Sequence, residues 1–198
     1  MRRRTFDALM VVAGLALAAI LLVAGGLLAW GHSFTSNQVH NQLAAQKIVF
    51  PAANNPEIKA LPAADAAAMK VYAGQLMTTG AQAATYADHF IAVHLREAAG
   101  GLTYSQVSYL AMTHPKNATY AAQVETLFKG TTLRGMLLNA YGFWKLGQLA
   151  LIGSIVAFIG AGLLLILSFF GLWHLRRVAP DVEVFPGIIQ REKVEAAS

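Results

Sequence analysis

The chain contains no cysteine, and charged residues make up only 13% of its 198 positions. Without thiols it can form no disulfide framework, no thiolate nucleophile and no cysteine-ligated cluster. It also lacks a glycine-rich phosphate loop and any recognisable Ser, His and Asp arrangement for nucleophilic catalysis. Basic and aromatic residues do not interleave as on a nucleic-acid-binding surface, so we expect no nucleic-acid partner despite a net charge of +5.

Two apolar runs without any charged residue bracket the chain, Ala8–Trp30 and Leu146–Trp173. They are 23 and 28 residues long. About 20 helical residues suffice to cross a hydrocarbon core of about 30 Å. The sequence therefore predicts a mainly α-helical membrane protein with two transmembrane helices, at 8–30 and 144–173, in contact with the lipid bilayer.

A cleaved signal peptide is the alternative interpretation of the first run. Its basic start and the small residues Ala29 and Gly31 fit that reading. The apolar core of a signal peptide, however, is about 7–15 residues long, which is shorter than this run. We therefore favour a retained span.

Arginine residues predict the orientation of the two spans. Arg2, Arg3 and Arg4 precede the first run, and Arg176 and Arg177 follow the second. Positive charges flank membrane spans on the cytoplasmic side. We therefore expect a multi-pass protein of the plasma membrane, with cytoplasmic segments at 1–7 and 174–198 and a helical extracytoplasmic domain at 31–143.

Tryptophan residues agree with this orientation. Trp30 and Trp144 lie at the predicted outer interface, and Trp173 lies at the inner one. Indole rings are enriched at both membrane–water interfaces because they are amphipathic. We expect these residues, together with Arg176 and Arg177, to anchor the spans at the interfaces.

The first part of the central segment reads as irregular chain followed by one long helix. Residues 32–61 are rich in Asn and Pro and contain one short β-type run, Lys47–Phe50. From Pro62 onward, apolar or small residues recur every three or four positions between Met69 and Val93. Because this phase continues past Gly80, it predicts a single helix.

Local signals then mark the following helix boundaries, namely Gly100-Gly101, the capping-box pattern Thr103–Gln106, Asn117, and Thr131 or Thr132. Paired glycines suit the left-handed cap of the long helix, and a Thr followed by Gln three residues later is typical of a helix start. We expect helices at about 104–112 and 118–129. A final helix should begin at the threonines and continue into the second span.

Small residues repeat along one face of each span. Gly14 and Ala18 are four residues apart in the first span, and Gly153, Ala157 and Ala161 follow the same spacing in the second. Small side chains let helices approach closely in lipid. These faces are therefore candidate packing surfaces, either for each other or for a partner.

One group of residues has the composition of a metal site. His89, His94 and Glu97 contain the ligand types of a non-haem iron triad. At 100° per residue, however, His89 and His94 lie about 140° apart around a helix, so they cannot bind one ion. We expect no metal and no cofactor, and we expect a hydrogen bond between His94 and Glu97, which share a helix face.

Several short segments resemble a known family: Gln46–Val49, Tyr86–Asp88, His94, Gly100–Tyr104 and Thr132–Arg134. The chain is similar there to two-span membrane proteins of actinobacteria that often carry the name aromatic ring-opening dioxygenase. The resemblance implies the two-span layout, and it implies that His94, Gly101, Thr103 and Tyr104 form a shared structural corner, to which we add the neighbouring Glu97. The chemistry in that name needs a convergent iron triad, which these residues do not form.

These observations predict a binding role rather than an enzyme. We expect a non-catalytic accessory subunit of a larger membrane complex, such as an energy-converting or oxidising enzyme. Its partners would be other membrane subunits, contacted through the spans and the outer helices. The alternative is a stand-alone extracytoplasmic protein that binds or senses a ligand, although the sequence specifies no small molecule.

Overall fold

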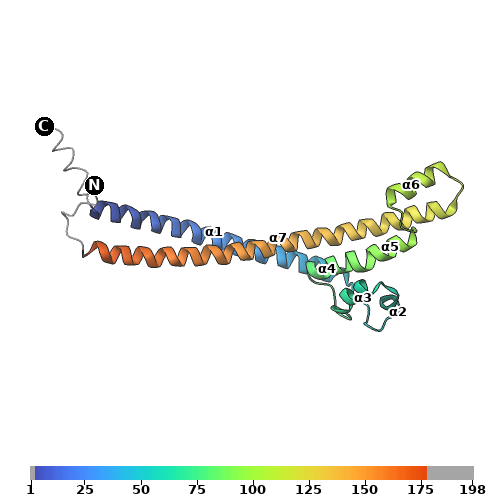
Figure 1. The fold of residues 1–198 in the computed structure, drawn as a ribbon, viewed down its shortest axis with the longest axis horizontal. Coiled ribbons are helices and arrows are strands. Elements are labelled where there is room, and N and C mark those ends of the chain that lie inside the picture. The colour runs from blue at the N-terminus through green and yellow to red at the C-terminus, as the bar shows by residue number, and fades with distance from the viewer. Residues whose placement is uncertain (1–2, 178–198) are drawn as a thin grey trace, which may run out of the picture. The chain divides into compact units, whose positions relative to one another are not determined.

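The computed structural model describes residues 3–177 and the side chains of residues 5–177, a range that is mainly helical and forms no strand. Two helices, α1 (Arg3–Gln46) and α7 (Ala118–Leu175), are long and apolar enough to cross a membrane. Shorter helices lie between them in the chain (Figure 1), namely α2 (Pro56–Ala60), α3 (Ala63–Lys70), α4 (Gly80–Tyr86), the π-helical turn η1 (Ala87–Ile91), α5 (Ala92–Ala98) and α6 (Tyr104–Thr113). The predicted mainly helical fold with two spanning-length helices is thereby confirmed.

The chain divides into two compact units, which we name the hairpin unit (Met1–Trp30 with Ala150–Ser198) and the central unit (Gly31–Leu149). In the hairpin unit, α1 and α7 run antiparallel (Figure 1). Ala18 and Ala161 are completely buried there, and Ser154 Oγ donates a buried hydrogen bond of 2.8 Å to the Gly25 carbonyl. The two apolar helices therefore pack directly against each other.

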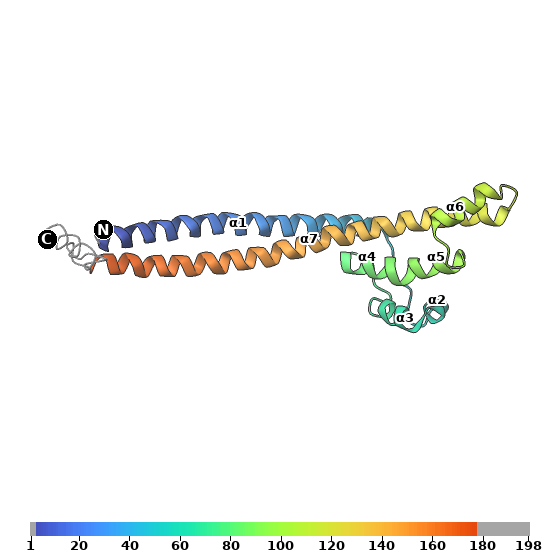
Figure 2. The same cartoon turned by 45° about the horizontal axis from the view of Figure 1, so that its top comes forward.

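The core of the central unit forms around the middle helices. Its largest fully buried side chains are Phe50, Ile58, Met69 and Met77, and Val107 belongs to a second, smaller cluster with Ala99 and Leu127. The Phe50 ring lies 5.4 Å from the Tyr72 ring and 5.4 Å from the Tyr86 ring, measured between centroids. Figure 2 shows α4 and α5 lying between α7 on one side and α2 and α3 on the other.

The prediction of irregular chain over 32–61 is wrong for its first half, because α1 continues to Gln46. Val39 and Leu43, four residues apart, are 4% exposed and belong to the central core. Burial of this stripe outweighs the modest helix propensity of the surrounding Asn, Ser and Thr residues. The helix ends at Lys47, whose φ of 55° is left-handed.

The prediction of one long helix from Pro62 onward is also wrong. After α3 the chain turns at Gly74, where φ is 72°, and α4 begins only after Thr79. Thr79 and Gln82 form a capping box, in which the Gln82 side chain also accepts from the Thr78 amide at 2.8 Å. The spacing of apolar residues continues regularly across this turn only by coincidence, because α3 and α4 each bury an apolar stripe of their own.

The β-type run at 47–50 forms only a minimal pairing. Val49 and Leu76 make an isolated antiparallel bridge. The Met77 amide donates to the Ile48 carbonyl at 2.8 Å. This pairing holds the segment after α1 against the segment before α4, which explains why the predicted single helix is interrupted here.

The helix boundaries that depend on local chemistry are confirmed. Gly100 and Gly101 follow α5 with φ values of 58° and 86°. Thr103 and Gln106 form the expected capping box of α6. Asn117 Oδ1 accepts from the Thr119 amide at 3.0 Å, at the start of α7.

A separate helix beginning at Thr131 or Thr132 is not formed, because α7 is continuous from Ala118. The Thr131 hydroxyl instead donates to the Leu127 carbonyl at 2.6 Å, within the helix. Glycine is tolerated at position 130 because the Leu95 side chain occupies the space that a Cβ at this position would need. Most of the predicted cytoplasmic segments 1–7 and 174–198 lies outside the described residues.

We predict that Gly80→Ala destabilises the central unit and that Gly135→Ala does not. A Cβ at Gly80 would overlap Cβ of Trp144, whereas nothing lies within 4 Å of a Cβ at Gly135. Overpacking costs about 1–3 kcal/mol. Removing glycine from an open helical position gains up to about 1 kcal/mol. Thermal unfolding in detergent, followed by circular dichroism, measures both, and equal melting temperatures would contradict this packing.

Candidate functional site

The central unit contains a groove with a cavity volume of about 740 Å³. Its walls come from the last part of α1, from α4 with η1, and from α7. Ligand sites in proteins typically measure about 300–1,000 Å³. The groove therefore has the size of a binding site, and we take it as the candidate functional site.

The floor of the groove is apolar and buried. Val39 and Leu43 are 4% exposed on α1, and Leu137 is 7% exposed on α7. Phe90 and Ile91 add partly buried apolar surface from η1. An occupant would therefore meet hydrocarbon at the bottom of the groove.

A π-helical turn places the aromatic wall. In η1 the Ala92 amide donates to the Ala87 carbonyl, five residues earlier. The Phe90 ring lies 4.9 Å from the Tyr86 ring and 4.4 Å from the His94 ring, measured between centroids, with the planes tilted in both pairs. Single π-helical turns inside α-helices occur frequently at functional sites.

The rim of the groove exposes large apolar side chains. Phe34, Leu133, Met136 and Phe143 are exposed to 56%, 55%, 66% and 54%. They come from both long helices, so both sides of the groove expose apolar surface. Exposed apolar surface of this kind often marks a contact site.

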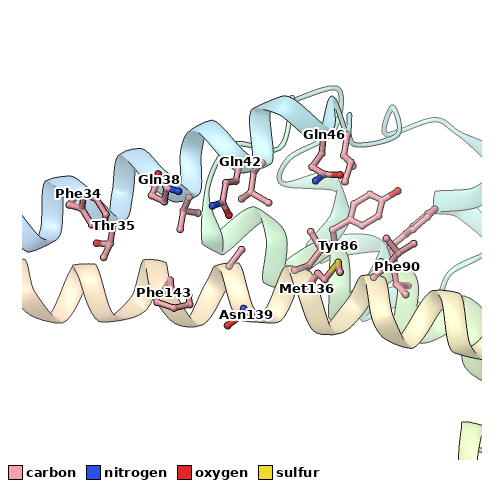
Figure 3. A pocket seen from close by; sticks show the side chains of 17 residues that line it. Phe34, Thr35, Gln38, Gln42, Gln46, Tyr86, Phe90, Met136, Asn139 and Phe143 are labelled. Atoms are coloured by element: carbon pink, nitrogen blue, oxygen red, sulfur yellow. The ribbon is translucent and has the colours of Figure 1, made fainter.

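Neutral amides line the same rim. Gln38, Gln42 and Gln46 follow one another at a spacing of four on α1, and Asn139 faces the groove from α7. Figure 3 shows Gln42 and Gln46 extending from α1 toward the side of the groove formed by α7, with Tyr86 and Met136 near Gln46. Within the described part of the chain these four amides have no hydrogen-bond partner. They are available to a bound molecule.

None of the described residues that line the groove carries a charge at neutral pH. Its titratable side chain is Tyr86, whose pKa is raised above 10.0 mainly by burial and secondarily by the negative charge of Glu57. The phenol therefore stays protonated at physiological pH. The groove is suited to an uncharged occupant.

The ionisable side chains of η1 make their contacts outside the groove. Arg134 Nη2 donates to Asp88 Oδ1 at 2.6 Å, and His89 Nδ1 donates to Asp65 Oδ1 at 2.7 Å. These contacts connect η1 to α7 and to α3. They hold the π-helical turn in place without bringing charge into the groove.

The small residues predicted as packing faces all lie between α1 and α7 in the hairpin unit, namely Gly14, Ala18, Gly153, Ala157 and Ala161. A Cβ on Gly14 would lie 2.6 Å from Ser168 Oγ, and a Cβ on Gly153 would lie 3.2 Å from Leu28 Cδ1. The structure thus uses these faces to bring the two helices of the same chain together.

The predicted structural corner is only partly assembled. Its residues are His94, Glu97, Gly101, Thr103 and Tyr104. The Gly101 amide donates to the Arg96 carbonyl at 2.7 Å, and the Tyr104 ring lies 6.0 Å from Phe128. His94 Nδ1 donates to the Phe90 carbonyl at 2.7 Å, and Glu97 is exposed. The predicted bond between His94 and Glu97 is therefore wrong.

The predicted interface anchors lie at separate points of the two long helices. Trp30 is 67% exposed on α1, and Trp144 stacks on Tyr141 at 6.2 Å. The Arg177 guanidinium lies 4.2 Å from the centre of the Trp173 ring, and Arg176 is exposed. A cation over an indole face is a favourable contact at an exposed site.

Sequence reasoning missed the groove because residues 32–46 read as irregular. The signal was present in the spacing of Gln38, Gln42 and Gln46, which continues the helical period of Val39 and Leu43. The groove residues of η1 and α7 showed no such signal in the sequence. Their positions in the groove depend on contacts between segments that are distant in the chain.

The chain matches no protein-family model, no curated protein and no solved structure. Its function is therefore argued from the groove and the surfaces described above.

We predict that the Tyr86 phenol makes the unfolding free energy fall as pH rises above 10. The unfolded chain ionises at the ordinary pKa of 10.0, while the folded chain holds its proton to higher pH. Ionisation therefore favours the unfolded state first. Denaturant unfolding of wild type and Tyr86→Phe at pH 9 and above measures this loss.

Tyr86→Phe should be less sensitive to high pH than wild type. Tyr109→Phe removes an exposed phenol and should retain the sensitivity of the wild type. Identical pH profiles for wild type and Tyr86→Phe would contradict the proposed cause.

Proposed function

We propose that the chain is a two-span protein of the plasma membrane, with both termini in the cytoplasm and the helical domain at 31–143 outside. Two helices of spanning length support the membrane location. Arginines before the start of the first apolar run and after the end of the second support the orientation. The contact between Arg177 and Trp173 also fits an interface at that end of α7.

Within that layout, we propose that the protein is a non-catalytic accessory subunit of a larger membrane complex. The observation that carries this proposal is the exposed aromatic and methionine surface of α6. Tyr109 and Met112 are exposed to 63% and 73%. Tyr, Phe and Met are enriched in protein–protein interfaces.

The geometry of α6 supports a docking face. Val107 is fully buried against Leu127, so it marks the inner side of the helix. Tyr109 and Met112 lie about 160° and 140° around the helix from Val107, on the outer side. The chain itself does not cover this surface, and a neighbouring subunit would bury it.

The structural roles of the ionisable groups support a binding role over catalysis. Asp65 with His89, and Asp88 with Arg134, hold η1 to its neighbours. Among the described residues, no three His, Asp or Glu side chains are grouped as metal ligands would be. These ionisable side chains thus have a structural role.

A stand-alone ligand-binding protein is the second candidate, and the groove is the observation that favours it. The groove combines an enclosed apolar floor with unpaired amides, which is typical of sites for small molecules. The two roles are compatible, because α6 and the groove use different surfaces of the central unit.

We also propose that the chain belongs with the actinobacterial two-span proteins that it resembles in sequence. The two apolar helices and the paired glycines after α5 support this relationship. The proposal concerns the layout of the chain and assigns no activity.

We predict that a cysteine at Lys116 reacts with a membrane-impermeant maleimide in intact cells, whereas a cysteine at Ser198 reacts only after permeabilisation. The chain has no native cysteine, so each variant carries a single thiol. Lys116 is exposed and belongs to the domain proposed to lie outside. Labelling of Ser198→Cys in intact cells would contradict cytoplasmic termini.

We predict that the tagged full chain, extracted in mild detergent, co-purifies with other membrane proteins at fixed stoichiometry. The double variant Tyr109→Ser with Met112→Ser should reduce the amount recovered about tenfold or more, because Tyr is enriched among the interface residues whose truncation costs about 2 kcal/mol or more. Quantitative mass spectrometry of the purified sample measures the ratio.

Val71→Ser is the matched control. Val71 is 66% exposed and lies between α3 and α4, away from α6, so its loss should leave the partner in place. Recovery of the wild-type chain only as a monomer or homodimer would overturn the subunit proposal.

A further inference from the structure

We infer that the groove binds one acyl chain of a neutral membrane lipid, and that Gln42 and Gln46, at one end of the groove, hydrogen-bond the lipid's uncharged ester and hydroxyl oxygens. This inference rests on the proposed membrane location and deepens the ligand-binding role. Four observations carry it: the dimensions of the groove, its lack of charge, its free amides and its position along α7.

The dimensions favour an extended chain. The α1 wall runs from Phe34 to Gln46, which is about 18 Å at 1.5 Å per residue. Each leaflet of a bilayer contributes about 15 Å of hydrocarbon, half of a core of about 30 Å. A single acyl chain therefore fits the length of the groove. The floor formed by Val39, Leu43 and Leu137 gives an acyl chain a buried apolar surface to lie on.

The polar groups select a neutral lipid. The described lining offers no cation for a phosphate group and no carboxylate for an amine. It offers amide N–H donors, which suit ester carbonyls, and amide carbonyls, which suit hydroxyl groups. A diacylglycerol has this combination of uncharged oxygens and hydrocarbon.

The position of the groove fits access from the bilayer. Phe143 lines the groove and directly precedes Trp144, the predicted outer interface anchor. The second apolar run begins at Leu146, less than one helical turn later. A lipid at the interface therefore has a short path to the exposed apolar rim.

Photo-crosslinking in liposomes tests the inference. The full chain is reconstituted in phosphatidylcholine liposomes with a diacylglycerol that carries a diazirine in one acyl chain. Proteolysis and mass spectrometry then locate the adducts. We expect adducts on groove residues such as Met136 and Leu137, in addition to those in the two spans. Unlabelled diacylglycerol should displace the groove adducts, and anionic phosphatidylglycerol should not.

Two variants with one matched control make the result specific. Ala140 is partly buried in the groove, so Ala140→Trp should obstruct its middle and reduce the groove adducts about tenfold or more. Ala121→Trp adds the same side chain at an exposed position of α7 outside the groove and should change nothing. Gln42→Leu with Gln46→Leu alters only exposed side chains, and each lost hydrogen bond should reduce groove adducts about 2- to 10-fold.

The possible outcomes distinguish failure of the lipid site from failure of the proposed membrane location. Adducts in the spans but none in the groove would overturn the lipid site and leave the membrane location standing. Absence of adducts in both spans would overturn the membrane location and the lipid site together. Groove adducts that persist in Ala140→Trp, or that are lost when a co-purified polypeptide is added to the liposomes, would also overturn the inference.

Discussion

The close packing of α1 against α7 is the constraint on which the other features depend. In the hairpin unit, Ala18 and Ala161 are fully buried where larger side chains would separate the helices. In the central unit, His32 Nδ1 donates to the Gly147 carbonyl at 2.9 Å, and Thr35 packs against the same glycine. Because the groove takes its two long walls from these helices, their spacing determines whether the groove exists at all.

The distribution of charge separates the binding surface from the scaffold. Asp88 with Arg134 and Asp65 with His89 are paired beside the groove, so that η1 is held firmly while its inner side stays apolar. The groove retains only neutral polar groups, namely amides and the protonated Tyr86 phenol. This arrangement favours a molecule that is mostly hydrocarbon with uncharged oxygens. It differs from sites for phosphates or metal ions, which commonly use Arg, Lys, carboxylate or imidazole side chains.

Sequence reasoning succeeded where structure depends on neighbouring residues. The glycine pair after α5 and the capping box of α6 were both predictable, because the backbone conformation and the side chain that satisfies it lie within four residues. It failed over 32–46 and between α3 and α4. There, the helix is extended by burial of Val39 and Leu43, and the chain is interrupted by pairing of Ile48 with Met77. Neither contact can be read from local pattern, because the partners are distant in the chain.

By itself the sequence determined two helices of spanning length and the positions of the strongest caps, because length, hydropathy and turn chemistry act over short distances. Only the tertiary structure decided what the small residues Ala18 and Ala161 contact, since either a partner or the same chain could have covered them. It alone also placed the amides of α1 opposite Phe90 and Met136, which come from other helices. The groove forms between surfaces of α1, η1 and α7, and these surfaces meet only after the chain has folded.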